Sequence, residues 1–533
     1  MPLPNELKVD EWQHLKMQVG AEILKNLSKG IYSNPGNTIK ELINNSYDAD
    51  ATEVVIRARP EFDTITITDN GEGMNETEFK EDFVVISRSR KRDAGLYTQR
   101  LKRPVIGKIG IGFISALQIC DEVTFISKKR EENLKLEAKV DFGKFKGEMA
   151  KKAKFQDISD VHFRNVPEET ETHYTMVIMS KLGEDFKDIL SDKDLRGIDI
   201  IDFQGVTFEE IADQIEKRIG RGELEDFTKA KGKRAIGQYW NMMLQIANTV
   251  PVPYLDNGPI KESGKFDVIE ELKKEISALK FDVDFDGIHL RKPVRFPNVP
   301  EISEEGRDYD VYTFKEKYDF KDGSNLRFKG YIYNQRKSIL PTQFRGIIIR
   351  IKNVAIGSFF PDFLDYPYSE KLWLPWTNGE IYVEEGLEEA MNIDRNTFNL
   401  AHPHYRKLKN YLHNLLHTKV FIRVRNRYTS RMEERKEFEQ VEKSRLRKEL
   451  LASKFGYAFE IKYNDDFYPK RPVDINTDTK TLIIYRFHPI FDKYKQKKQF
   501  LEDVLILFEI AYSLSGGEGK KLREIFLDEI KRW

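Results

Sequence analysis

Three short segments, rich in polar residues and glycine, follow one another near the start of this chain. Residues 37–51 have apolar side chains at helical spacing and predict a helix capped by Asn37 or Thr38. Residues 64–71 alternate like a half-buried strand and run into the turn sequence Asp-Asn-Gly. The glycines within residues 107–112 open an apolar, helical run, and a glycine-rich loop before a helix is a place to bind phosphate. This order, followed by adjacent strands, favours an α+β layer over alternating βαβ units.

Composition limits where the chain can work. Its 533 residues suggest three or four domains, and a mean hydropathy of −0.58 argues against a membrane protein. The single cysteine, Cys120, excludes an internal disulfide, and no leader is apparent, so a cytoplasmic protein is expected. Basic and acidic residues number 88 each, so any binding to nucleic acid must be local.

The pattern of breaks predicts three domains. The first covers residues 1–250 and ends at a Pro-Val-Pro sequence, which places a boundary near 250–265. A second α+β region covers 266–425. A charged linker helix and a small C-terminal α/β unit cover 426–533.

The polar residues of the first segment suit phosphate chemistry. Glu41 and Asn45 are four residues apart, so both leave one face of the helix, and Asp48 lies a turn further on. A carboxylate and an amide on one face can hold a water and a hydrated metal ion. Each segment alone also has a simpler interpretation: an amphipathic helix, a hairpin turn and a tight connection.

Taken together, the three segments resemble the GHKL family of ATPases, named for gyrase, the ninety-kilodalton heat-shock chaperone, histidine kinases and MutL. The resemblance is carried by ELINNSYDA at 41–49, ITDNGEGM at 67–74 and GKIGIGF at 107–113. HYTMVI at 173–178 is a weaker match, because the family often has Gly-Thr there. The motifs are closest to the heat-shock chaperone and the MutL and MORC branches.

The resemblance implies a Bergerat ATP-binding sandwich and a role for each matched position. Glu41 would be the general base for the attacking water and Asn45 a Mg²⁺ ligand. Asp69 would accept a hydrogen bond from the adenine amino group, which favours ATP over GTP. The other matched positions expected to bind nucleotide are Asp48, Gly71, Gly73, Met74, Gly107, Lys108, Gly110, Ile111, Gly112, Phe113 and Thr175.

Residues 75–106 correspond to the family's ATP lid. Within them, Ser89 and Lys91 either face the nucleotide or belong to a solvated basic loop.

The second region resembles a transducer domain. The sequence AMNIDRNTF at 390–398 is similar to the middle-domain loop of the heat-shock chaperone, whose arginine reaches the γ-phosphate. By this match Arg395 is the candidate cation, although a helix-start arginine paired with Glu388 or Glu389 is an equal alternative. Lys337 is the second choice.

The family resemblance predicts an Mg²⁺-dependent ATPase that closes its lid and forms a nucleotide-dependent homodimer. Its target would be DNA or a partner complex, in genome maintenance or defence. The alternative is a chaperone-like ATPase that acts on protein clients. The arginines at 423–431 suit contacts with a nucleic-acid backbone or a solvated helix junction.

Overall fold

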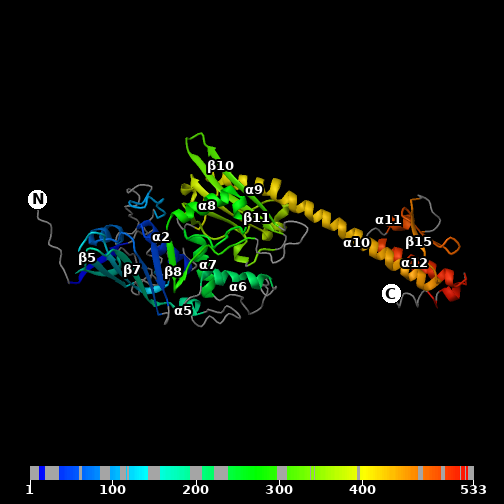
Figure 1. Ribbon diagram of the computed structural model, residues 1–533, viewed down its shortest axis with the longest axis horizontal. Helices are drawn as coiled ribbons and strands as arrows, with labels where there is room; N and C mark the ends of the chain where they lie inside the picture. Colours follow the sequence, from blue (N-terminus) through cyan, green and yellow to red (C-terminus); the bar gives the residue numbers. More distant parts are fainter. Residues whose placement is uncertain are drawn as a thin grey trace. The chain divides into compact units, whose positions relative to one another are not determined.

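The computed structural model consists of two compact units, Met1–Ile422 and Arg423–Trp533. Helices and mixed sheets both contribute, so the predicted α+β class is confirmed (Figure 1). The described residues are 11–18, 35–58, 63–83, 97–107, 116, 119–141, 157–191, 207–220, 238–296, 309–335, 338–340, 342–392, 396–465, 472–493, 498–516, 518–522 and 524–525.

A nine-stranded sheet forms the base of the first unit. Its strands pair antiparallel except for β2 and β8, which run parallel. In spatial order the strands are β1 (Gln13–Gln18), β6 (Asp157–Pro167), β5 (Leu134–Asp141), β4 (Cys120–Lys128), β7 (Tyr174–Leu182), β3 (Thr64–Asp69), β2 (Glu53–Arg57), β8 (Asp282–Phe285) and β9 (Ile288–His289).

Two helices pack on this sheet and on each other: α2 (Pro35–Asp48) and α7 (Gln238–Thr249). Their apolar faces join the strands in one core, which includes Ile39 and Ile43 of α2 and Trp240 of α7. Burial of these side chains fixes which face of α2 remains available for polar contacts.

Helix α2 differs from its predicted bounds of 37–51. It begins at Pro35, because proline at the first helical position needs no backbone hydrogen-bond partner. It ends at Asp48, and Asp50 has a positive φ of 60°. The Asp50 carboxylate accepts hydrogen bonds from the backbone N–H groups of Arg100 and Leu101, at 2.8 and 3.2 Å, so the turn is tied to a distant segment.

The first sheet does not end at the predicted boundary near 250–265. Strand β8, at Asp282–Phe285, pairs with β2, and β9 extends the same sheet. The Asp286 carboxylate reinforces this join, since it accepts hydrogen bonds from Ala58 N and from the Tyr239 hydroxyl, at 2.8 and 2.7 Å.

A second, five-stranded sheet lies in the described part of the first unit. Its order is β10 (Tyr309–Asp319), β11 (Asn325–Gln335), β14 (Thr377–Glu385), β12 (Gly346–Ile351) and β13 (Val354–Ala355). The remaining helices and helical turns of this unit are α3 (Glu76–Glu78), η1 (Phe79–Phe83), α5 (Glu184–Ser191), α6 (Phe208–Gly220), η4 (Ser263–Lys265), α8 (Asp267–Ala278), η5 (Thr342–Phe344), η6 (Ser369–Trp376), η7 (Glu388–Ala390), α9 (Pro403–Leu415) and η8 (Leu416–Val420).

A buried ion pair lies under this second sheet. Arg350 Nε donates to Glu380 Oε2 at 2.8 Å, and the two side chains are 0% and 3% exposed. The hydroxyls of Tyr254, Tyr331 and Tyr382 also donate to the Glu380 carboxylate, at 3.0, 3.1 and 3.0 Å. Burial raises the pKa of Glu380, but Arg350, Lys292 and the Tyr254 hydroxyl together hold that pKa below its ordinary value.

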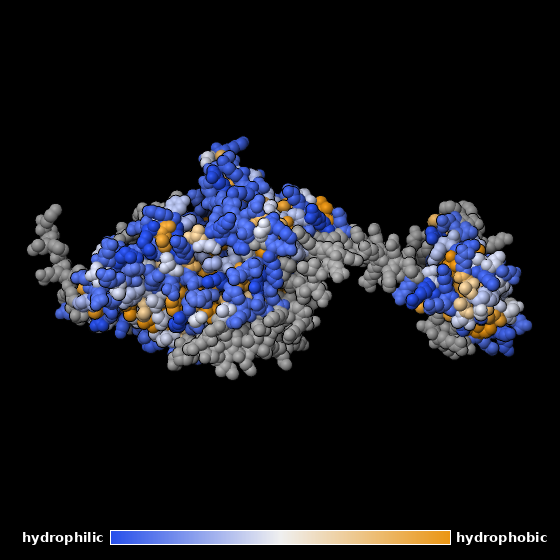
Figure 2. Space-filling model, viewed as in Figure 1, coloured by the Kyte–Doolittle hydropathy of each residue, from blue (hydrophilic) through white to orange (hydrophobic). Residues whose placement is uncertain are grey.

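The second unit contains a small sheet and two helices that follow a long helix. Helix α10 runs over Phe421–Phe455, so its first residues belong to the first unit. The sheet order is β15 (Glu460–Asn464), β17 (Thr481–Tyr485) and β16 (Val473–Asn476), and the helices are α11 (Pro489–Lys493) and α12 (Lys498–Leu514). Helix α12 leaves Phe500, Phe508 and Tyr512 exposed, and hydrophobic residues are visible on one face of this unit (Figure 2).

Candidate functional site

Asp69 is the buried acceptor at the centre of the site. Ser46 Oγ on α2 donates to Asp69 Oδ2 at 2.7 Å, and Gly71 N donates to Asp69 Oδ1 at 2.9 Å. Burial raises the pKa of Asp69 to about 6, against the opposing effects of Ser46, Gly71 and His173. Near neutral pH a buried carboxylate is therefore held in place and oriented by two donors.

Thr175 lies directly opposite Asp69, where β3 pairs with β7. The Thr175 hydroxyl is 3.0 Å from Ser127 Oγ, and Ser127 Oγ accepts a hydrogen bond from Met74 N at 2.8 Å. The structure thus joins Asp69, Met74 and Thr175, all predicted from the sequence, around one strand end.

Gly71 and Gly73 are required by close backbone contacts. A Cβ on Gly71 would lie 2.7 Å from Ala49 O. Gly73 has a φ of +67°, and a Cβ there would lie 2.1 Å from Lys128 O. These glycines let the loop pack against α2 and β4, which is a structural reason for them beside the predicted approach to a nucleotide.

Asp48 holds the entrance to the glycine-rich segment. Its two carboxylate oxygens accept hydrogen bonds from Ile106 N and Gly107 N, each at 2.7 Å. Gly107 is thereby fixed beside the last turn of α2. Direct contact between Asp48 and a nucleotide stays a prediction.

Several predicted residues lie outside the described part of the chain. They are Ser89, Lys91, Lys108, Gly110, Ile111, Gly112, Phe113, Lys337 and Arg395. In the arginine group at 423–431, Arg423 and Arg425 are exposed on α10. The side chains of residues 427–431 lie outside the described part of the chain.

A cavity of about 250 Å³ opens beside α2. Glu41 and Asn44 line it from the helix, and Lys352, Met391 and Asn392 line it from the region of the second sheet. The two regions are tied together at this point, because the Lys40 ammonium donates to Ala355 O at 2.8 Å and the Lys352 ammonium donates to Val105 O at 2.9 Å. Met391 and Asn392 therefore lie on the Glu41 side of α2.

Three residues of the site were not selected from the sequence: Ser46, Ser127 and His173. Ser46 lies within the 41–49 motif, but its helical spacing groups it with the apolar residues Ile39, Leu42 and Ile43. His173 begins the weaker match at 173–178, whereas Ser127 belongs to no motif. Their contacts with Gly71 O and with Met74 N depend on strand pairing.

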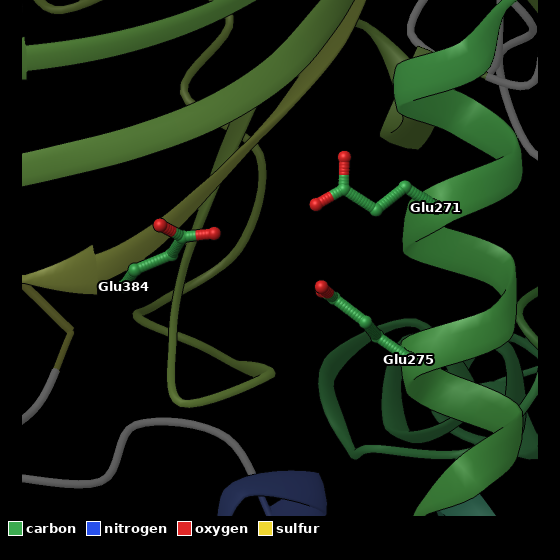
Figure 3. Close-up of side chains that lie close together, drawn as sticks. All are labelled: Glu271, Glu275 and Glu384. Atoms are coloured by element: carbon green, nitrogen blue, oxygen red, sulfur yellow. The ribbon is translucent and has the colours of Figure 1, made fainter.

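One group of three carboxylates among the described residues has the spacing of a metal site. Glu271 and Glu275 of α8 and Glu384 of β14 point toward one another (Figure 3), with ligand oxygens within 4.8 Å. The Lys329 ammonium fills this position, since it lies 2.9, 2.7 and 2.9 Å from Glu271, Glu275 and Glu384. Burial opposes its charge, but the carboxylates raise the pKa of Lys329 above the ordinary value.

Lys329→Met is expected to make the stability of the protein dependent on calcium. The change leaves three carboxylates facing one another, and carboxylate oxygens are the ligands that Ca²⁺ prefers. We expect a lower melting temperature in chelator and its recovery in millimolar Ca²⁺. Lys329→Arg is the matched control and should show neither effect. Equal stabilisation of the wild type by Ca²⁺ would contradict the assignment of this position to Lys329.

The comparisons with known proteins match the same part of the chain. Residues 32–172 match a family model described as histidine kinase-, DNA gyrase B- and HSP90-like ATPase. This region is a GHKL-type ATPase domain. Ser46, Asp69 and Ser127 all fall within it, and Thr175 follows its last matched residue closely.

Curated relatives of the GHKL domain include chaperones and a protein named as a restriction enzyme. The chaperone protein HtpG of Vesicomyosocius okutanii is 28% identical over 207 residues, 32% of this chain and 34% of the relative. HtpG of Polaromonas naphthalenivorans is 35% identical over 130 residues, 20% of this chain and 21% of the relative. A Herpetosiphon aurantiacus protein that carries the name of a type II restriction enzyme, HgiDII, is 37% identical over 98 residues, 18% of this chain and 15% of the relative. The chain thus spans about a third or less of the length of these relatives.

Within the described residues, no helix is both long and apolar enough to cross a bilayer.

Proposed function

We propose that this protein binds and hydrolyses ATP in an Mg²⁺-dependent reaction. The observation that carries the proposal is Asp69, a buried carboxylate fixed by Ser46 and Gly71 at the end of β3. An ionised acceptor in that position is suited to the adenine amino group, and Thr175 opposite it supplies a hydroxyl.

The other predicted binding residues suit ATP bound together with Mg²⁺. Asn45, one turn beyond Glu41 on α2, would offer its amide oxygen to the ion, which in proteins is held by few side chains together with phosphate oxygens. Gly107, held by Asp48, would begin the set of amides around the phosphates. Bound Mg²⁺ supplies charge stabilisation at the phosphates.

Glu41 is the proposed general base and Arg395 the proposed cation at the γ-phosphate. Support for this pairing comes from the cavity beside α2, because Glu41 lines it together with Met391 and Asn392, which precede Arg395 closely in the sequence. Glu41 is 7% exposed, so a water beside it would be shielded from bulk solvent.

We further propose that ATP closes the lid and joins two copies of the chain, which then act on DNA or on a partner complex in genome maintenance or defence. The HgiDII relative supports a role in DNA restriction. The HtpG relatives support the second candidate, a chaperone-like ATPase for protein clients.

Glu41→Ala is expected to reduce ATP turnover by roughly 10²–10⁴-fold while ATP affinity changes little, because only the general base is lost. Steady-state phosphate release, with and without double-stranded DNA, measures the first effect, and calorimetry measures the second. Acceleration by DNA in the wild type alone would favour the DNA-acting candidate, whereas a rate indifferent to DNA would favour protein clients. Turnover in Glu41→Ala equal to that of the wild type would sink the assignment of the base.

A further inference from the structure

Asn44 is a buried amide that the fold leaves unsatisfied. Its side chain is 2% exposed, and neither Oδ1 nor Nδ2 has a hydrogen-bond partner within the described part of the chain. Buried polar groups are almost always paired, because leaving one unpaired sacrifices its hydration without replacement. Two unpaired amide atoms therefore indicate an occupant that the described residues do not supply.

The position of Asn44 indicates where that occupant lies. Asn44 follows Glu41 by three residues on α2, so both side chains leave the same face of the helix. Both line the cavity of about 250 Å³ beside α2. This space is large enough for ordered water, and a bound water needs two to four polar partners of the kind that Glu41 and Asn44 provide.

We propose that Asn44 is a positioning residue that holds the attacking water against Glu41 during ATP hydrolysis. This inference rests on the proposed function. The water oxygen forms the new bond to the γ-phosphorus, one water proton passes to the Glu41 carboxylate, and the bond to the bridging oxygen breaks to release ADP. Asn44 Oδ1 accepts the hydrogen bond from the other water proton, so that the lone pair of the water faces phosphorus, and Asn44 exchanges no proton.

This role predicts an unusual separation between stability and turnover. Asn44→Leu replaces an unpaired amide by an apolar side chain of similar size, so the folded state loses no hydrogen bond. The melting temperature should stay the same or rise. ATP affinity should remain within about threefold of the wild type, because the amide contacts water and not the nucleotide. The kcat should fall at least tenfold, because only Glu41 would then orient the attacking water.

The experiment compares wild type, Asn44→Leu, Asn44→Ser and Glu41→Ala by steady-state ATP turnover, ATP calorimetry and thermal unfolding. Asn44→Ser keeps a hydroxyl that can accept from water and should recover part of the lost kcat. An unchanged kcat in Asn44→Leu would overturn the inference, as would a joint fall in melting temperature, affinity and kcat, which marks a structural role. If the wild type does not exceed the Glu41→Ala rate, the proposed function itself fails and this inference fails with it.

Discussion

Glu380→Gln is expected to lower the free energy of unfolding of the first unit by roughly 3–5 kcal/mol. The change keeps the size of the side chain, but it removes the charge opposite Arg350 and leaves one acceptor oxygen for tyrosine hydroxyls that donated to two. Arginine does not lose its proton in proteins, so a buried cation would remain without its counterion. Lys292, fully enclosed nearby, would also lose the attraction of Glu380.

Denaturant unfolding of the full chain measures this effect. Glu385→Gln is the matched control, because Glu385 is on the same strand and pairs at the surface with Arg327 at 3.3 Å. An exposed pair of this kind contributes at most about 1 kcal/mol. The double change Arg350→Met with Glu380→Gln should recover part of the loss, since the buried guanidinium is then no longer left without its counterion. Equal unfolding midpoints for Glu380→Gln and Glu385→Gln would show that the buried pair is not needed.

Asp69→Asn is expected to weaken ATP binding by about 100-fold or more, in line with the loss of a hydrogen bond to a charged acceptor. The Gly71 N–H would occupy the amide oxygen, and the NH₂ group would present a donor where the adenine amino group also donates. The fold should not suffer at neutral pH, because the amide can donate to Ser46 Oγ, and Ser46 also lies 3.2 Å from Leu42 O. Calorimetry and thermal unfolding of the same preparations separate the two effects.

The raised pKa of Asp69 adds a pH dependence to this comparison. The pKa of Asp69 is about 6 in the folded protein, which is above the pKa of an aspartate in the unfolded chain. Protonation of Asp69 therefore stabilises the folded state at low pH, and this contribution is lost as the pH rises through 6. ATP affinity should run in the opposite direction, because the ionised carboxylate is the better acceptor. Wild-type affinity should fall between pH 7.5 and 5.5, and Asp69→Asn should lack that part of the dependence. Undiminished ATP affinity in the variant would contradict the adenine contact.

The sequence predicted well those elements whose pattern is local. The alternating residues at 64–68 form β3, and the predicted strand at 346–351 of the second region is β12. Both patterns can be recognised from neighbouring residues alone. The sequence did not predict that β8 pairs with β2 and extends the first sheet. That strand joins residues on both sides of the apparent boundary, and its pairing with β2 depends on register between distant segments.

The candidate site likewise combines features that the sequence predicts with features that depend on contacts between distant segments. Motifs located Asp69 and the helix of Glu41, since helical spacing brings residues of one face together. They did not reveal that Ser127 connects Met74 with Thr175, or that Asn44 is buried without a partner among the described residues. Both facts depend on the packing of strands and of the second region against α2, which no single segment contains.

The pairing of β2 with β8 also has a consequence for folding during synthesis. The contact that ties them, from Ala58 N to the Asp286 carboxylate, joins residues 228 positions apart. At about 5–20 residues per second, a ribosome needs roughly 10–45 s to make the intervening chain. During that interval β2 is an open sheet edge, and such edges invite pairing with other chains. The nascent protein must therefore protect this edge until its own later strand arrives.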